Sequence, residues 1–494
     1  MQLIGNDSQK VIDVIRVTKK DEVYIKLDCE ASTAQELCDY FTFTVPGHTF
    51  MPAYRMKIWD GKIRLFNIHS RVLYGGLLEY VFQFAEKRNY QVIPDGDWWK
   101  PKKIEKNEKF IEDLKLPFEV RDYQFEAFHH ALSYKKCLLI SPTASGKSLI
   151  IYLIVRALGV KTLIIVPTTS LVSQLYGDFI EYGWDSQLHC HKVFAGQDKV
   201  SDKQVVISTW QSIYKLNKKI FEPYKLVIGD EAHGFKSKSL TSIMTKCTNA
   251  EYRIGTTGTL DGTQTHKLVL EGLFGRIHKV TTTKKLIDRK QLSPFTVKIL
   301  ILKYPEVVCQ SIRKHKYQEE LEFLVQHEKR NKYIRNLVLS LETNTLLLFR
   351  LVKKHGRILY EMIKEQADVT DRKTFFVFGG TDTDTREEIR RIAERESNAI
   401  IVASYGVFST GINIRNLHNI IFASPSKSRI RNLQSIGRGL RLSDNKELTT
   451  LYDITDDLCS GARKNYTFQH YEERLKIYNE ERFPFQLYKI PIKA

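Results

Sequence analysis

Short apolar runs alternate with stretches of helical pattern from residue 137 onward. Four such runs occupy residues 137–140, 162–167, 205–208 and 225–230. Uninterrupted apolar runs of this length are typical of strands that are buried on both faces, as in a parallel sheet. Stretches of helical pattern follow the first two runs, at residues 149–158 and 170–182. The alternation predicts β-α-β units, and therefore an α/β domain built on a parallel sheet.

The same pattern returns in the C-terminal half of the chain. Four more apolar runs occupy residues 345–349, 374–378, 399–404 and 419–424. We predict two α/β domains of similar size, at residues 116–285 and 286–460, followed by a short helical tail at residues 461–494. The stretch at residues 313–335 is basic, and we assign it no role beyond a general attraction for polyanions.

A lysine-rich segment at residues 101–115 contains few apolar residues and is typical of a linker. It separates the two predicted domains from residues 1–100, which we expect to form a small N-terminal α/β domain. Within that domain, Asp60 and Gly61 lie between the segments IW and KIRLF. An Asp-Gly pair between alternating residues predicts the turn of a β-hairpin.

The composition indicates a partner of opposite charge. The 494 residues include 76 lysines and arginines against 57 aspartates and glutamates, a formal net charge of +19. Such a protein usually meets a polyanion, either nucleic acid or an anionic membrane surface, and charge alone does not choose between them. The seven cysteines include no C-x-x-C pair, which argues against a zinc ribbon. With no membrane-length apolar run and no signal-peptide pattern, we expect a soluble cytoplasmic protein.

A phosphate-binding loop is predicted at SPTASGKS, residues 141–148, between an apolar run and a helical stretch. The P-loop pattern is G-x-x-x-x-G-K-[ST], and Ser141 replaces its first glycine. We expect Lys147 to meet the β- and γ-phosphates of a nucleotide, and Ser148 to bind Mg²⁺. The residues expected to surround the phosphates are Thr143, Ala144, Ser145 and Gly146.

Two further motifs fit the same chemistry. DEAH spans residues 230–233 and begins with the last residue of the apolar run at 225–230. Asp230 and Glu231 are expected to hold Mg²⁺ through the nucleotide, and Glu231 also to act as general base towards the attacking water. RDYQ lies upstream of the loop, where Arg121 and Gln124 are expected to contact the nucleotide, with Gln124 reading the adenine edge. A glutamine at this position favours ATP over GTP, which argues against a GTPase switch.

The second domain supplies the arginines that such a site needs. QSIGRGLR spans residues 434–441, and Arg438 and Arg441 are three apart, so on a helix they share one face. Together with Gln434, they are expected to stabilise the charge that develops on the transferring phosphate. Taken alone, each of these residues is also readable as an ordinary surface group.

Taken in order, residues 118–457 resemble a superfamily-two helicase, and within it the UvsW helicases of tailed bacteriophages. The narrower resemblance rests on IVPTTSLVSQ, GTDTDTRE, VASYGVFSTGI and IWDGKIRLF. It implies two tandem RecA-like domains that bind ATP between them, with Gly411 at the nucleotide. It also implies 3′→5′ unwinding, strand annealing, fork regression and Holliday-junction branch migration by a monomer. Asn413 departs from the family pattern, in which many members have Asp.

A motor must also hold its nucleic acid, here expected to be single-stranded, double-stranded, forked and four-way DNA. Hydroxyls and amides at strand ends contact phosphates without reading sequence. The candidates are Thr168, Thr169, Thr209, Gln211, Ser409 and Thr410, and Trp59, Lys62 and Arg64 in the N-terminal domain. The threonines are equally readable as loop caps, and Trp59 as a core residue. An RNA helicase, a duplex translocase without strand separation and a non-catalytic nucleic-acid scaffold remain alternatives.

Overall fold

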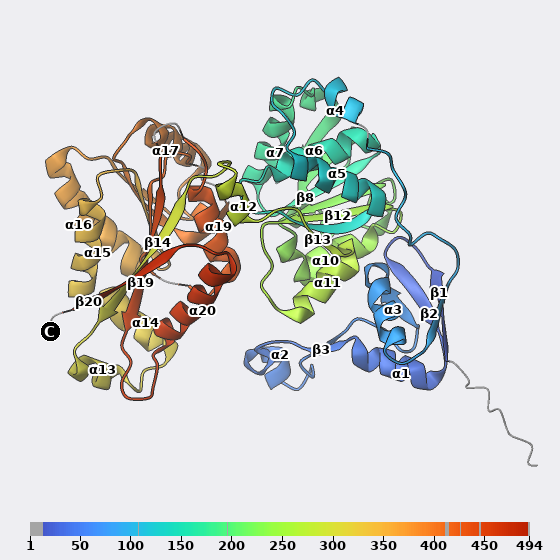
Figure 1. Ribbon diagram of the computed structural model, residues 1–494, viewed down its shortest axis with the longest axis horizontal. Coiled ribbons are helices and arrows are strands. Elements are labelled where there is room, and N and C mark those ends of the chain that lie inside the picture. The colour runs from blue at the N-terminus through green and yellow to red at the C-terminus, as the bar shows by residue number, and fades with distance from the viewer. Residues whose placement is uncertain are drawn as a thin grey trace, which may run out of the picture. The chain divides into compact units, whose positions relative to one another are not determined.

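The computed structural model describes residues 13–106, 108–194, 196–410, 414–424, 426–443 and 446–492. Its contacts divide the chain into two compact units (Figure 1). The first unit holds residues up to 280 except 141–147, and the second holds 141–147 together with residues 281 onward. Across the described ranges, no helix has both the length and the apolar character that crossing a membrane requires.

The first unit contains a seven-stranded parallel sheet in the order β13-β7-β12-β11-β8-β10-β9. Its strands are β7 (Lys136–Ile140), β8 (Thr162–Val166), β9 (Cys190–Val193), β10 (Val205–Thr209), β11 (Leu226–Asp230), β12 (Tyr252–Thr257) and β13 (Ile277–Lys279). The four strands expected from apolar runs are therefore confirmed. All five residues of β8 and of β10 are buried, as a strand covered on both faces requires.

Helices cover both faces of this sheet, with α5, α6 and α7 on one side and α10 and α11 on the other (Figure 1). The larger ones are α5 (Asp122–Tyr134), α6 (Lys147–Leu158), α7 (Thr169–Glu181), α10 (Lys238–Lys246) and α11 (Gln264–Phe274). Shorter elements are α4 (Glu108–Asp113), α8 (Ser186–His189), α9 (Trp210–Ile213), η3 (Lys218–Phe221) and η4 (Ala232–Lys236). Residues 149–155 of α6 are all buried, so α6 packs at the centre of its layer.

The N-terminal domain is a small α/β domain, as expected. Its sheet has the order β5-β2-β1-β6 and is formed by β1 (Val14–Lys19), β2 (Tyr24–Asp28), β5 (Val72–Tyr74) and β6 (Gln91–Pro94). The helical elements beside it are α1 (Ala31–Tyr40), η2 (Gly75–Leu77) and α3 (Leu78–Glu86). One apolar core runs from these elements into α10 and α11. The Tyr80 hydroxyl donates to Glu271 at 2.6 Å across this junction. The N-terminal domain is therefore packed firmly on the rest of the first unit.

The β-hairpin predicted around Asp60 and Gly61 is wrong. Strand β4 (Lys62–Arg64) pairs antiparallel with β3 (Thr42–Thr44), and the chain between them forms η1 (His48–Phe50) and α2 (Pro52–Arg55). Pro52 favours a helix start because it lacks an N–H and has a helical φ. The Asp60 side chain accepts from the Lys62 N–H at 3.1 Å, so the Asp-Gly pair only turns the chain into β4.

The second unit contains another seven-stranded parallel sheet, in the order β16-β17-β15-β18-β19-β14-β20. Its strands are β14 (Phe295–Lys303), β15 (Thr345–Phe349), β16 (Thr374–Val377), β17 (Ile400–Ser404), β18 (Asn419–Phe422), β19 (Thr449–Asp457) and β20 (Phe485–Pro491). Around it lie α12 (Thr283–Asp288), α13 (Glu306–Ile312), α14 (Tyr317–Gln326), α15 (Glu328–Ser340), η5 (Val352–Gly356), α16 (Arg357–Ala367), η6 (Asp368–Thr370), α17 (Thr383–Arg395), α18 (Tyr405–Thr410), α19 (Arg429–Gly439) and α20 (Tyr466–Glu480). Two RecA-like parallel-sheet domains are thus present.

The C-terminal tail is helical only over α20, because β20 adds an edge strand that pairs with β14. The helix is fixed to the sheet by a buried ion pair between Arg474 and Asp453 at 2.8 Å. The physical reason is that α20 covers β19, whose carboxylates need partners once they are buried. Residues 461–492 are therefore part of the second α/β unit rather than an appendage.

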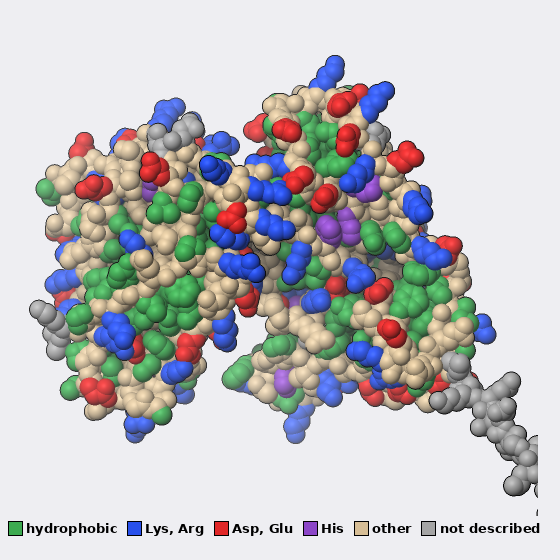
Figure 2. Space-filling view, viewed as in Figure 1, with side chains coloured by type: hydrophobic (Ala, Val, Ile, Leu, Met, Phe, Trp, Pro, Cys, Tyr) green, Lys and Arg blue, Asp and Glu red, His purple; other side chains and the backbone are tan. Residues whose placement is uncertain are grey.

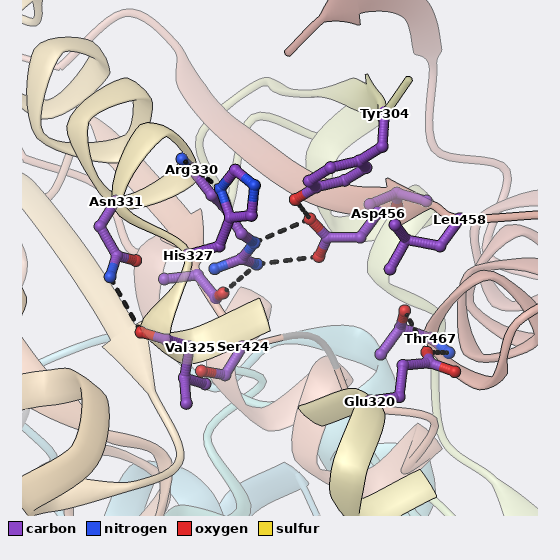
Figure 3. A network of polar contacts seen from close by, with 12 residues as sticks. Tyr304, Glu320, Val325, His327, Arg330, Asn331, Ser424, Asp456, Leu458 and Thr467 are labelled. Atoms are coloured by element: carbon purple, nitrogen blue, oxygen red, sulfur yellow. Dashed lines mark hydrogen bonds and ion pairs between the residues drawn. The ribbon is translucent and has the colours of Figure 1, made fainter. Parts of the chain in front are cut away.

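The basic stretch at residues 313–335 also has a structural role that its charge does not predict. Arg330 is 1% exposed and binds both carboxylate oxygens of Asp456, at 2.7 and 2.9 Å (Figure 3). The Tyr304 hydroxyl donates to the same carboxylate at 2.8 Å, and Arg330 also donates to the Ala423 carbonyl. The network joins α15 to β19 and to the residue that follows β18, so Arg330 is a core residue and not a surface cation.

Candidate functional site

Three predicted motifs lie at the ends of strands of the first seven-stranded sheet. Strands of a parallel sheet end at the same edge, which is where open α/β sheets bind ligands. The P-loop follows β7, DEAH (residues 230–233) begins with the last residue of β11, and the segment TTGT (residues 256–259) spans the end of β12, which lies between β7 and β11 in the sheet. The predicted nucleic-acid contacts at 168–169 and 209–211 follow β8 and β10, farther along that edge.

The P-loop has the backbone that its glycine requires. Gly146 has φ +80° and Ala144 has φ +65°, a region that side chains rarely adopt. Ser145 is buried, and its hydroxyl lies 2.5 Å from the Ser141 hydroxyl and 2.6 Å from the Pro142 carbonyl. Ser141, which replaces the first glycine of the pattern, thus braces the loop from inside. Thr143 lies in the same turn and is partly exposed.

Helix α6 begins at Lys147, immediately after the loop, so its first amide groups face the loop. The Lys147 ammonium donates to the Ser141 carbonyl at 3.3 Å, folding back over the loop. The Ser148 hydroxyl lies 2.9 Å from the Tyr182 hydroxyl. Burial raises the pKa of Tyr182, which therefore stays a neutral hydrogen-bonding partner.

The DEAH residues are held by side chains from β12. The Thr256 hydroxyl donates to the Asp230 carboxylate at 2.7 Å. Glu231 has φ +50° and ψ +49°, a left-handed conformation that is uncommon for any residue other than glycine. His233 Nδ1 lies 3.3 Å from the Glu231 carboxylate and 3.1 Å from the Thr257 hydroxyl. The left-handed backbone of Glu231 and its contact with His233 therefore fix the orientation of the Glu231 side chain.

Three residues that orient this site were missed as site residues: Tyr182, His233 and Thr256. His233 was available from the DEAH motif itself, and Thr256 from TTGT. Tyr182 belongs to no recognisable motif. Its contact with Ser148 spans 34 residues and arises only from packing. Among the described residues, no group of three or more His, Cys, Asp or Glu forms a metal-binding cluster.

The RDYQ motif forms the start of α5. Gln124 is 4% exposed, and its side-chain oxygen accepts from the Arg121 backbone N–H at 3.0 Å. The Arg121 guanidinium donates to the Tyr123 hydroxyl at 2.8 Å. Both residues are thus positioned by the helix terminus.

In the second unit, Gln434 and Arg438 are four residues apart on α19 and share one face of it. The expectation that Arg441 lies on the same helical face is wrong, because α19 ends at Gly439 and Arg441 follows its C-cap, Leu440. The two glycines of GRG weaken helix continuation, which explains the early end. The backbone of Ser409 and Thr410 closes α18, and Gly411 and Asn413 lie outside the described residues.

Family comparisons match three successive parts of the chain. Residues 14–95 match the N-terminal domain of the DNA helicase UvsW, 117–262 match the res subunit of type III restriction enzymes, and 328–443 match the helicase conserved C-terminal domain. The ATP-dependent DNA helicase UvsW of Enterobacteria phage T4 is 34% identical over 95% of this chain and 98% of its own length. The chain belongs to the UvsW family of ATP-dependent DNA helicases.

As a UvsW-family helicase, the chain is a nucleic-acid-stimulated ATPase that uses ATP and binds nucleic acid. More distant relatives match a smaller share of the chain. The DNA 3′-5′ translocase XPB2 of Sulfurisphaera tokodaii is 27% identical over 70% of this chain and 85% of its own length. A fragment of a putative HsdR subunit from Vibrio vulnificus has a TM-score of 0.57 at 18% identity, covering 78% of this chain and 72% of that one. The latter shows a shared fold.

Three of the nucleic-acid contacts predicted for this helicase at the sheet edge, Thr168, Thr209 and Gln211, take part in hydrogen bonds within the protein. Thr168 caps α7 by accepting from the Leu171 N–H, and Thr209 pairs with Ser212 at 2.9 Å. The Gln211 amide donates to the Pro167 carbonyl at 3.3 Å and so ties the loop after β10 to the loop after β8. Thr169 is exposed. The side chain of Thr168 therefore acts as a helix cap, whereas that of Thr209 makes no cap hydrogen bond to the backbone of α9.

In the N-terminal domain, Trp59 is half-buried, and its indole N–H donates to the Lys62 carbonyl at 2.8 Å. Arg64 is exposed and pairs with Asp60 at 2.5 Å. Hydrogen bonds from Arg64 and the Lys62 backbone lower the pKa of Asp60. The three predicted residues therefore lie together on one surface, although not on a hairpin.

Proposed function

We propose that this helicase remodels branched DNA by fork regression and Holliday-junction branch migration, with strand annealing as a further activity, in replication, recombination and repair. The arrangement of P-loop, DEAH and nucleic-acid loops along one sheet edge carries the proposal. A site that hydrolyses ATP beside loops that hold DNA can convert one event into the other. The matched UvsW N-terminal domain, at residues 14–95, supports the assignment to branches.

The proposed roles of the ATP-site residues rest on their chemistry and on the motifs to which they belong. Lys147 and the amides of the P-loop would bind the phosphates, and Glu231 would orient and deprotonate the attacking water. Ser148 and Asp230 are hard oxygen donors that fit Mg²⁺, which would neutralise phosphate charge when bound. Thr256 already fixes the Asp230 carboxylate at 2.7 Å, so its direction would not change on binding.

The remaining proposed contacts come from both units. Arg121 and Gln124 would hold the adenine end of ATP, whereas Gln434, Arg438 and Arg441 would stabilise the transferring phosphate. Gly411 is proposed at the nucleotide from the family resemblance alone. The proposed DNA contacts are Thr168, Thr169, Thr209, Gln211, Ser409, Thr410, Trp59, Lys62 and Arg64.

The test compares ATP hydrolysis in the presence of a single strand, a blunt duplex, a fork and a four-way junction of matched sequence. The proposal predicts the strongest stimulation by the fork and the junction. Equal stimulation by all four would refute the assignment to branches. A Glu231→Gln variant, which keeps the shape of the side chain but not its basicity, controls for contaminating ATPase.

A duplex translocase that does not separate strands is the second candidate, favoured by the likeness to a DNA 3′-5′ translocase. Displacement of a third strand from a triplex without unwinding of a fork would favour it. We also infer a monomer that acts in the cytoplasm of the host cell, in keeping with its phage relative. Sedimentation with and without forked DNA tests the monomeric state.

A further inference from the structure

A projecting segment of the N-terminal domain has features that the ATP site does not explain. Residues 45–61, here called the finger, lie between β3 and β4 and include η1 and α2. Figure 1 shows α2 held away from α1 and α3. The Val45 N–H donates to the Gly61 carbonyl at 2.8 Å and closes the base of the finger beside the β3–β4 pair.

The finger is internally braced. Backbone hydrogen bonds join Met51 to His48 at 2.9 Å and Met56 to Pro52 at 2.8 Å. The ring of His48 packs edge-on against Tyr54, with 4.6 Å between ring centroids. Its other side faces Gly61, where a Cβ atom would lie 2.4 Å from the imidazole. The finger therefore presents its side chains in a fixed arrangement, which lowers the entropy cost of binding.

Large apolar side chains on the finger face solvent. Phe50 is 76% exposed, Ile58 is 72% exposed and Met56 is 62% exposed. Single exposed apolar residues are normal, but several on one braced segment mark an interaction surface. Figure 2 shows hydrophobic side chains close to lysine and arginine side chains on the projection that carries α2.

An open hollow of about 790 Å³ lies against this surface. Its walls include the aromatic residues Tyr54 and Trp59 and the cations Arg55, Lys57 and Arg64. Asp60 also lines it and is paired with Arg64, so Arg55 and Lys57 leave an excess of positive charge. Aromatic faces beside cations suit a ligand that has a flat ring and a negative charge. A nucleotide has both.

Duplex DNA presents phosphates and groove edges to its surroundings, whereas base faces are available only where the strands have parted. An exposed apolar tip gains little from an intact duplex, but it can pack on an unstacked base. We propose that the finger binds unpaired nucleobases at a DNA branch, with one displaced nucleotide held in the hollow between Trp59 and the pair Arg55 and Lys57. This inference rests on the proposed function, and it specifies the unpaired bases as the part of the branch that the N-terminal domain recognises.

The test uses forked DNA that carries 2-aminopurine at the first unpaired position, and a blunt duplex of the same sequence. The wild-type full-length chain, without nucleotide, is expected to change the 2-aminopurine fluorescence as the base enters the hollow. A Phe50→Ser/Ile58→Ser variant should lose this change and bind the fork about tenfold more weakly, the equivalent of one lost base stack. Its affinity for the blunt duplex should stay within about twofold.

A matched control is Val307→Ser, which alters a side chain that is 78% exposed on α13 and should leave fork binding unchanged. An Arg55→Gln/Lys57→Gln variant should weaken fork binding and reduce its salt dependence by roughly two phosphate contacts. Circular dichroism checks that each variant is folded, as is expected for exposed positions.

Wild-type affinity of the serine variant for the fork would overturn the proposal. An equal loss on fork and blunt duplex would also overturn it, since that result indicates backbone contacts only. Normal DNA binding with loss of a protein partner would assign the finger to protein docking instead. The 2-aminopurine fluorescence is measured without ATP turnover. The fluorescence change can therefore be observed even if forks do not stimulate ATP hydrolysis and the proposed function is refuted.

Discussion

Replacing Arg330 by methionine removes the cation from a buried network in the second unit. Arg330 is 1% exposed, and its partner Asp456 is 0% exposed. Methionine fills much of the space of the arginine stem but leaves the carboxylate with the Tyr304 hydroxyl, which donates to it at 2.8 Å. One hydrogen bond to a neutral group cannot replace two bonds to a guanidinium.

The expected loss follows from the burial. Breaking a buried ion pair by removing one partner costs about 3–5 kcal/mol, because the other charge stays desolvated. For a domain of 150–250 residues, this corresponds to a fall of roughly 10 °C in melting temperature.

The two units can be followed separately. All five tryptophans, at positions 59, 98, 99, 184 and 210, belong to the first unit. Denaturation followed by tryptophan fluorescence therefore reports the first unit, whereas far-ultraviolet circular dichroism reports both. We expect Arg330→Met to shift the part of the dichroism transition that fluorescence does not follow, and to leave the fluorescence transition unchanged.

Two controls make the result specific. Lys354 and Glu322 form an exposed pair, with side chains 56% and 41% exposed, so Lys354→Met should cost at most about 1 kcal/mol. The double variant Arg330→Met/Asp456→Leu removes both charges and should recover most of the lost stability. A loss for Arg330→Met no larger than for Lys354→Met, or no recovery in the double variant, would refute the reasoning.

Three further predictions concern the P-loop and the stability of the first unit. Lys147→Ala should reduce DNA-stimulated ATP hydrolysis at least about 100-fold, measured by phosphate release, and unchanged turnover would exclude the assigned role. Gly76→Ala would place a Cβ atom 2.0 Å from the Glu271 carbonyl, so it should destabilise the first unit by about 1–3 kcal/mol in the fluorescence transition. Burial, and then the charges of His278 and His129, lower the pKa of His130 to about 4, so the unfolded state binds its proton first as the pH falls. Stability of the first unit should therefore fall between pH 6.5 and 4, and His130→Gln should flatten that fall in fluorescence melts.

The strands predicted from the sequence are those in which the apolar composition of the residues matches their burial. β10 reads VVIST, and all of it is buried, so apolar composition and position coincide. α6 behaves in the same way, with seven successive buried residues after the P-loop. Local chemistry was also sufficient for the loop itself, because a Gly-Lys-Ser turn before a helix needs no distant partner.

Other strands were not predicted, because charged residues interrupt their apolar pattern. β19 reads TTLYDITDD, which by pattern is exposed, yet all nine of its residues are buried. Arg474 and Arg330 neutralise its aspartates at positions 453 and 456 from 21 and 126 residues away in the chain. β12 also contains a buried charged residue, Arg253. The Arg253 guanidinium donates to the backbone carbonyls of Met244, Cys247 and Leu273. A charge can be buried only beside its partner, and the partner is chosen by packing.

The sequence by itself determined the two parallel sheets, the order of the ATP-site motifs and their placement at strand ends, because each depends on neighbours within a few residues. Only the tertiary structure decided that Tyr182 meets Ser148, that Thr256 holds Asp230, and that a predicted hairpin is instead a braced finger. Those outcomes depend on residues 26 to 34 positions apart, or on a competing strand partner for β4. Hydrogen bonds and ion pairs over such separations form only after the apolar core has fixed the elements that carry them.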